Sequence, residues 1–394
     1  MWSRRFEPEA GLHEHVVPPQ GDSKVAAGTL DCAKPVRHRS QFRGVQRGAT
    51  RLSATPDAKI ATQPAAVAPW IGAQTSRLLG QRGHAWLLHG PSGLGQYELA
   101  MQLVRAWLCE NPAPAGACGV CTSCHAIDVR THADLFVLMP ETVMLERGWP
   151  LSEKAQSELD EKKRRSSKEI RIEAMREAIE FSQRTSAWGR GKAVLLFPAE
   201  RMNPVSANAL LKTLEEPAGE VKFVLASEAA HSLMPTIRSR CLGHAMVWPD
   251  ADQAIEWMVA RNVGRETAQT LLRAAGGRPD DALRMAGSGH DPKTWALLPK
   301  AVKRGDLSLT QDWSPTEIVH LLHKLCHDLQ LLGQGAVPRF FAARDLPEPP
   351  PQRILSHWGR ELARTTRTME HPFNPGLMRE ALMSQAKSAL NSGH

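Results

Sequence analysis

Residues 84–100 read HAWLLHGPSGLGQYELA, and the rest of the chain is best understood from this stretch. An apolar run comes first, then a glycine-rich turn, then apolar residues at helical spacing. A strand, a turn and a helix in this order are the layout of a phosphate-binding loop. A glycine-rich turn without a ligand is the alternative interpretation, because short motifs also occur by chance.

The chemistry of a working phosphate-binding loop is missing here. The motif G-x-x-x-x-G-K-[ST] requires a lysine that reaches the outer phosphates and a hydroxyl that holds Mg²⁺. Gln96 and Tyr97 stand at those two positions, while Gly90 and Gly95 still permit the tight turn. We therefore expect a loop that keeps its shape and binds no ATP of its own.

A second loss concerns the same chemistry. The apolar run at residues 193–197 predicts a buried parallel strand. In an active ATPase of this kind the strand ends in an acidic residue for Mg²⁺. This strand ends in Phe197-Pro198, and Glu200 is expected on the following turn in a capping or salt-bridge role.

Four cysteines predict a structural metal site. Cys109, Cys118, Cys121 and Cys124 have the spacing C-x8-C-x2-C-x2-C. Four thiolates suit tetrahedral Zn²⁺ and leave no open position for catalysis. Disulfides are the rival interpretation, which a reducing compartment disfavours. His125 is an alternative ligand.

Composition and charge limit the class of protein. The chain has 394 residues, 42% of them hydrophobic, and a net charge of +8, which suits two to three globular domains near a polyanion. No run is long and apolar enough for a membrane span, and no signal peptide is present, so we expect a cytoplasmic protein. Residues 1–68 are expected to be a disordered basic extension, or the product of a start assigned too early. A DNA-contacting arm is the functional alternative.

Three further stretches carry a family resemblance. They are residues 199–217 (AERMNPVSANALLKTLEEP), 221–226 (VKFVLA) and 235–241 (PTIRSRC). Together with the cysteine loop they closely resemble bacterial clamp-loader AAA+ subunits.

The resemblance implies a fold and a domain order. It implies an α/β domain with a P-loop-type parallel sheet at residues 69–249, which contains the zinc loop 109–124 and a charged insertion at 140–168. A small helical lid is expected at 250–288. An all-α collar domain for oligomerisation is expected at 289–394, although these helices could equally form only their own core.

Departures from the family's motor subunits imply a role. Motor subunits keep the loop lysine and an Asp-Glu pair after the second strand, and this chain has neither. The family's later arginine aligns with Asp280. This pattern is similar to the non-hydrolysing member of the DNA polymerase III loader. The implied partners are the gamma or tau motor subunits, the delta subunit, the sliding clamp and primed DNA.

One motif of the family is intact. By resemblance, Arg240 of Ser239-Arg240-Cys241 is an arginine finger offered in trans to ATP on a neighbouring motor subunit. A guanidinium forks onto phosphate oxygens and stabilises developing charge. An ion pair with an acidic residue on the chain's own surface is the alternative. An autonomous ATPase with an unusual loop is the alternative function. For DNA phosphates, the candidate residues are Arg184, Arg190 and Lys192, and a solvated surface position is an equally good interpretation of each.

Overall fold

The computed structural model describes residues 67–369, 371 and 374–392. The expectation for the extension at 1–68 therefore falls almost entirely outside the described residues. The strands are β1 (Ala85–His89), β2 (Leu135–Leu138), β3 (Lys192–Leu196), β4 (Val221–Ser227) and β5 (Leu242–Ala245). They form one sheet in the order β2-β3-β4-β1-β5.

All neighbouring strands of the sheet run parallel. Strand β1 lies between β4 and β5, with Leu87 opposite Leu225 and Gly243. Because β1 is internal, the turn that follows it opens at the carboxyl edge of the sheet, where α/β proteins bind ligands. The predicted strand at 193–197 is confirmed with a shift of one residue, since β3 ends at Leu196.

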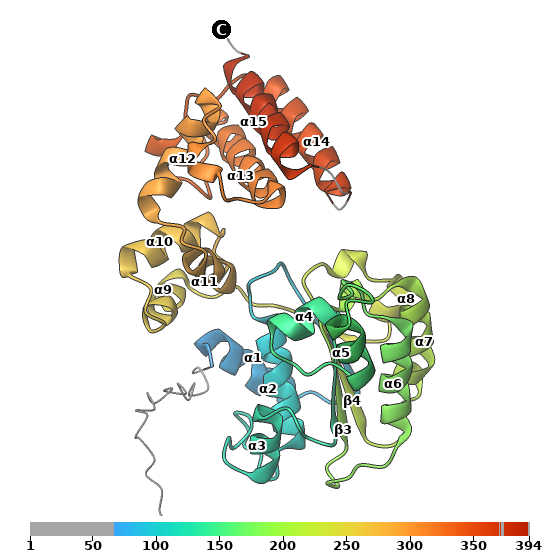
Figure 1. Cartoon of the computed structure of the whole chain (residues 1–394). Helices are drawn as coiled ribbons and strands as arrows, with labels where there is room; N and C mark the ends of the chain where they lie inside the picture. Colours follow the sequence, from blue (N-terminus) through green and yellow to red (C-terminus); the bar gives the residue numbers. More distant parts are fainter. Residues whose placement is uncertain (1–66, 370, 372–373, 393–394) are drawn as a thin grey trace, which may run out of the picture. The chain divides into compact units, whose positions relative to one another are not determined.

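Helices cover both faces of the sheet (Figure 1). The helices of this part are α1 (Pro69–Leu79), α2 (Gln96–Leu108), α3 (Thr122–Asp128), α4 (Glu141–Glu146), α5 (Glu153–Asp160), α6 (Ile172–Gln183), α7 (Pro204–Glu215) and α8 (Pro235–Arg238). Trp86 and Leu88 of β1 point to the core formed with α1 and α2. Leu87 points to the opposite core, formed with α6 and α7. This alternation explains why the strands are apolar throughout.

The charged insertion at 140–168 is partly helical. It holds the helices α4 and α5, neither of which has a buried residue. Arg164 joins them, because its guanidinium lies 2.5 Å from Glu141 and 2.6 Å from Glu158. These ion pairs, which apolar periodicity does not indicate, connect the two helices.

Helices alone follow the last strand. Helices α9 (Ala251–Val259), α10 (Arg265–Ala274) and α11 (Pro279–Gly287) share a small core of their own. Helices α12 (Pro292–Arg304), α13 (Pro315–Gly333), α14 (Gln352–Thr368) and α15 (Pro375–Asn391) enclose another, around Leu322, Leu325 and Trp358. Within the described part of the chain, no helix has the length and apolar character that a membrane crossing requires.

Candidate functional site

The glycine loop joins β1 to α2 in a conformation that only glycine adopts easily. Gly93 and Gly95 have φ angles of 78° and 88°, and Gly95 caps the helix. A Cβ at Gly93 would lie 2.6 Å from the Asp281 carboxyl carbon, and one at Gly95 would lie 2.8 Å from Ile71. The loop thus has the backbone shape of a phosphate cradle, with other parts of the chain pressed against it.

Gln96 turns its side chain back onto the loop. Its Nε2 donates to the carbonyl oxygens of Gly90, at 3.0 Å, and Pro91, at 2.7 Å. The residue is 2% exposed. A lysine here would carry a charge toward the outer phosphates, whereas this amide is neutral and its donor group is used within the loop.

Tyr97 fills the place of the metal-binding hydroxyl with a ring. Its hydroxyl oxygen accepts a hydrogen bond from Trp149 Nε1 at 2.7 Å, and burial raises the pKa of the phenol. The ring lies 5.5 Å from that of Phe197, and the Arg147 guanidinium lies over it at 4.0 Å. The two residues that replace the magnesium ligands therefore pack against each other.

Glu200 lies on a short turn after β3, as predicted. Its carboxylate accepts the backbone N–H of Glu228 at 3.2 and 3.3 Å. Burial raises the pKa of the Glu228 carboxyl. Glu200 thus fixes the end of β4 to this turn by a structural hydrogen bond.

The first turn of α11 places two acidic residues against the loop. The backbone N–H of Asp280 donates to the Gly93 carbonyl at 3.2 Å. Asp281 accepts a hydrogen bond from Ser92 and pairs with Arg278, each at 3.0 Å, and it also pairs with Arg284. Burial, followed by the charges of Glu98 and Asp281, raises the pKa of Asp280 to about 7.

Sequence reasoning missed the Ser92–Asp281 contact. The string Gly277-Arg278-Pro279-Asp280-Asp281 carries a helix-start signal, because proline and acids are typical of a first turn. Nothing in that signal indicates which loop the turn faces. The cavity beside the loop, about 430 Å³, is lined by acidic groups from three elements, including Glu98, Glu228 and Asp280.

The four predicted cysteines meet at one point. Their sulfur atoms all lie within 4.8 Å of one another, and this group does not include His125. Cys109 follows α2 and Cys121 caps α3, with their sulfurs 3.8 Å apart. Sulfurs at the corners of a tetrahedron with bonds of about 2.3 Å are separated by about 3.8 Å. The cluster therefore fits a tetrahedral metal ion.

Arg240 lies just after α8 and has a partner within the chain. Its Nε donates to Glu215 Oε1 at 2.6 Å, its Nη2 also contacts that oxygen, and its Nη1 donates to the Thr236 carbonyl at 2.8 Å. The Arg240 side chain is 30% exposed and that of Glu215 46%. The pair is thus at the surface, and Arg240 does not line the cavity beside the chain's own glycine loop.

The candidates for DNA contact differ in accessibility. Arg184 is exposed and pairs with Glu180 one helical turn away, and Arg190 reaches the Glu110 carbonyl at 3.5 Å. Lys192, the third candidate, is buried and does not offer its charge to a DNA phosphate. It is 6% exposed and lies 3.8 Å from Asp134, with its ammonium 3.9 Å from the Phe181 ring centre.

The strand order, the glycine loop after β1 and the helices after β5 define an AAA+ fold of the P-loop class. A family model described as "DNA polymerase III, delta subunit" matches residues 73–246. A Yersinia pestis protein named "DNA polymerase III subunit delta'" is 31% identical over 66% of this chain and 71% of its own. The chain belongs to the DNA polymerase III delta' family.

Two further relatives are similar to this chain over about half of its length. The Pseudomonas aeruginosa "DNA polymerase III subunit delta'" is 40% identical over 56% of this chain, and the match spans 62% of that protein's length. The Escherichia coli "DNA polymerase III subunit tau" is 32% identical over 52% of this chain and 29% of its own. The similarity thus extends to a second kind of subunit of the same polymerase.

Proposed function

We propose that this chain is the delta'-type subunit of a clamp loader, which helps to place the sliding clamp on primed DNA and hydrolyses no ATP itself. The observation that carries the proposal is the closed glycine loop. Gln96 uses its amide within the loop, and aromatic rings stand where the magnesium ligands would be.

Electrostatics supports this proposal. The carboxyl groups of Glu98, Glu228 and Asp280 line the cavity beside the loop. Two arginines also line it, but Arg147 is paired with Glu98 and Arg284 with Asp281. Among the described residues that line the cavity, a triphosphate would meet acidic groups and no cation without an acidic partner, and the carboxylates among these groups would repel it.

In our proposal Arg240 acts on the nucleotide of a neighbouring motor subunit. The contact with Glu215 does not oppose this role, because an ion pair between partly exposed groups contributes only about 0–1 kcal/mol. A phosphate on the neighbouring subunit offers oxygens to the same fork of donors. We therefore propose that Glu215 holds the guanidinium in place until the subunits assemble.

We also propose that the cysteine cluster holds one structural zinc ion. Cys109, Cys118, Cys121 and Cys124 would supply four thiolates and leave no position for substrate. Bound there, the metal would cross-link the end of α2 to the start of α3, where a short loop has little core of its own.

The proposed partners are the gamma or tau motor subunits, the delta subunit, the sliding clamp and primed DNA. An autonomous ATPase is the competing function. To separate the two, ATP turnover is measured for the isolated chain, for a motor subunit alone and for their mixture on primed DNA. We expect no turnover by the isolated chain and a rise in the mixture. Turnover by the isolated chain, abolished by Gln96→Ala, would show that the competing function is correct.

A further inference from the structure

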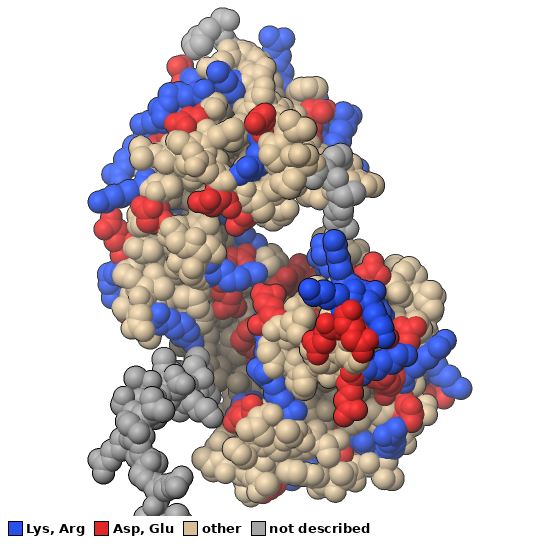
Figure 2. Space-filling model, in the orientation of Figure 1, with Lys and Arg blue, Asp and Glu red and all other residues tan. Residues whose placement is uncertain are grey.

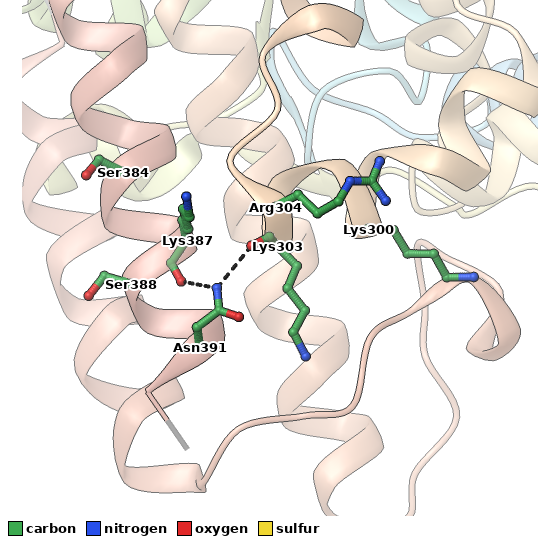
Figure 3. Close-up of a pocket in the computed structure, with 7 residues that line it drawn as sticks. All are labelled: Lys300, Lys303, Arg304, Ser384, Lys387, Ser388 and Asn391. Carbon is green, nitrogen blue, oxygen red and sulfur yellow. Dashed lines mark hydrogen bonds between the residues drawn. The ribbon is translucent and has the colours of Figure 1, made fainter. Parts of the chain in front are cut away.

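A groove in the C-terminal helices gathers positive charge. It lies between α12 and α15 and has a volume of about 740 Å³. Figure 3 shows the side chains that line it, which are Lys300, Lys303, Arg304, Ser384, Lys387, Ser388 and Asn391. Figure 2 shows Lys and Arg side chains over the α12 region, with acidic side chains beside them.

Two helices supply the two walls of this groove. Lys300, Lys303 and Arg304 are three and four residues apart on α12, so they share one face of that helix. Ser384, Lys387 and Ser388 have the same spacing on α15. One wall is therefore cationic, and the other combines a lysine with two hydroxyl groups.

Contacts between the helices fix the walls relative to each other. Asn391 Nδ2 donates to the Lys303 carbonyl at 3.0 Å and to the Lys387 carbonyl at 2.7 Å (Figure 3). Gly305 caps the carboxyl end of α12 with a φ of 74°. A Cβ at this position would lie 2.8 Å from the Lys387 side chain. The stem of Lys387 thus lies directly on the turn that ends α12, so this cation is positioned by the fold.

Three of the four cations of the groove have no counter-charge within the described residues. No carboxylate lines it, and Lys300, Lys303 and Lys387 form no ion pair there. Arg304 lies 4.0 Å from Asp306, whose carboxylate also accepts the backbone N–H of Ser308 at 2.9 Å. Cations held together without a counter-charge favour the binding of an anion.

We propose that this groove binds the phosphate groups of DNA. Ammonium, guanidinium, hydroxyl and amide donors are the groups with which proteins contact the DNA backbone. Cations along two neighbouring helices suit a chain of repeated phosphates better than a single small anion. The choice of DNA as the source of phosphate rests on the proposed function in replication, whereas the anion site rests on the groove alone.

Fluorescence anisotropy of a short labelled oligothymidylate, titrated with the full chain at several salt concentrations, tests this proposal. The double variant Lys300→Gln/Lys387→Gln removes one cation from each wall. We expect about a tenfold loss of affinity. The slope of the logarithm of the binding constant against the logarithm of the salt concentration should become shallower by about 1.4, the value for two lost phosphate contacts on a single strand.

The matched control is Arg353→Gln/Arg360→Gln, which removes the same charge from exposed positions on α14. We expect the control to bind nearly as tightly as the unchanged chain. Equal losses in both double variants would overturn the proposal, because net charge alone would explain them. All four substituted side chains are exposed, and circular dichroism checks that both variants fold.

Pyrophosphate as a competitor distinguishes the two sources of phosphate. If DNA is the ligand, pyrophosphate displaces the oligothymidylate only at concentrations far above that of the DNA. Displacement at matched phosphate concentration would overturn the assignment to DNA in favour of a free anion. Because this experiment uses the isolated chain and no ATP, its failure is distinct from a failure of the motor-subunit assay.

Discussion

Ser92 and Asp281, 189 residues apart in the sequence, are joined by a hydrogen bond of 3.0 Å. The contact attaches the first turn of α11 to the glycine loop. Arg278 strengthens it, because its Nη1 lies 2.9 Å from Ser92 Oγ and 3.0 Å from the Asp281 carboxylate. These side-chain contacts join the loop to α11 together with the backbone hydrogen bond from Asp280 to Gly93.

Asp280 should make the protein less stable as the pH rises. Its folded-state pKa is raised to about 7 from 3.8, so between these values the folded state keeps a proton that the unfolded state has lost. Its contribution to stability is full below about pH 4 and declines up to about pH 7. Asp280→Asn should therefore raise the free energy of unfolding at pH 8 by about 1–3 kcal/mol, with no gain at pH 4, as measured by urea denaturation.

Asp281→Asn is the matched control, and it should change the free energy of unfolding in the opposite direction. Asp281 pairs with Arg278 and Arg284 and accepts a hydrogen bond from Ser92. Its loss should lower the free energy of unfolding at pH 8 by about 1–3 kcal/mol. If both variants shifted stability in the same direction, the different environments assigned to the two carboxyl groups would be wrong.

Gly93→Ala should destabilise the protein more than another glycine in the same conformation. The φ of Gly93 is 78°, and a Cβ would lie 2.9 Å from the Asp281 backbone nitrogen. Gly189 has a φ of 73° and no atom within 4 Å of its added Cβ. Gly189→Ala should lower the free energy of unfolding by about 1 kcal/mol, because alanine disfavours the left-handed conformation. Gly93→Ala should lower it by at least about 1 kcal/mol more, because of the clash. Thermal melting of both variants measures the difference, and equal losses would contradict the close approach.

Arg240→Ala should leave assembly with the motor subunits intact and lower DNA-dependent ATP turnover. An arginine finger contributes about 10³-fold or more at its own site, so the loss silences one site, and we expect total turnover to fall by up to about half when other motor sites remain active. Arg238→Ala, an exposed neighbour, is the control and should have little effect. If a complex assembled with Arg240→Ala showed unchanged ATP turnover, Arg240 would not act on the ATP of a neighbouring motor subunit.

The purified chain should carry about one zinc ion, the content of a single site with four thiolate ligands. Cys118→Ser should lower the zinc content and the melting temperature, because the cluster loses one ligand. Cys241→Ser is the control. Burial raises the pKa of Cys241 to about 12, and it lies outside the cluster. Elemental analysis measures the metal, and a folded, metal-free protein would refute the site.

Much of the molecule could be read from the order of its residues. Local patterns predicted the strand and helix around the glycine loop, since apolar periodicity reports which faces are buried. The two losses at Gln96 and Phe197 were visible because the motif assigns chemistry to fixed positions. The cysteine spacing predicted a cluster, and the four sulfurs meet as that spacing requires.

Other features depended on contacts between distant residues. Within the insertion at 140–168, Arg164 joins Glu141 of α4 to Glu158 of α5. Lys192 looked available for DNA, yet it is buried beside Asp134, because a lysine at a strand start can extend its stem inward to a carboxylate. Such pairings have no period in the sequence.

The sequence by itself determined the class of fold and the absence of the usual phosphate and magnesium ligands, because both depend on residue type at fixed spacing. Only the tertiary structure decided what occupies the loop instead. The Gln96 amide bonds back within its own loop, whereas the approach of Asp281 to Gly93 and the partner of Arg240 join segments whose separation along the chain carries no signal. Their positions follow from packing of the whole domain.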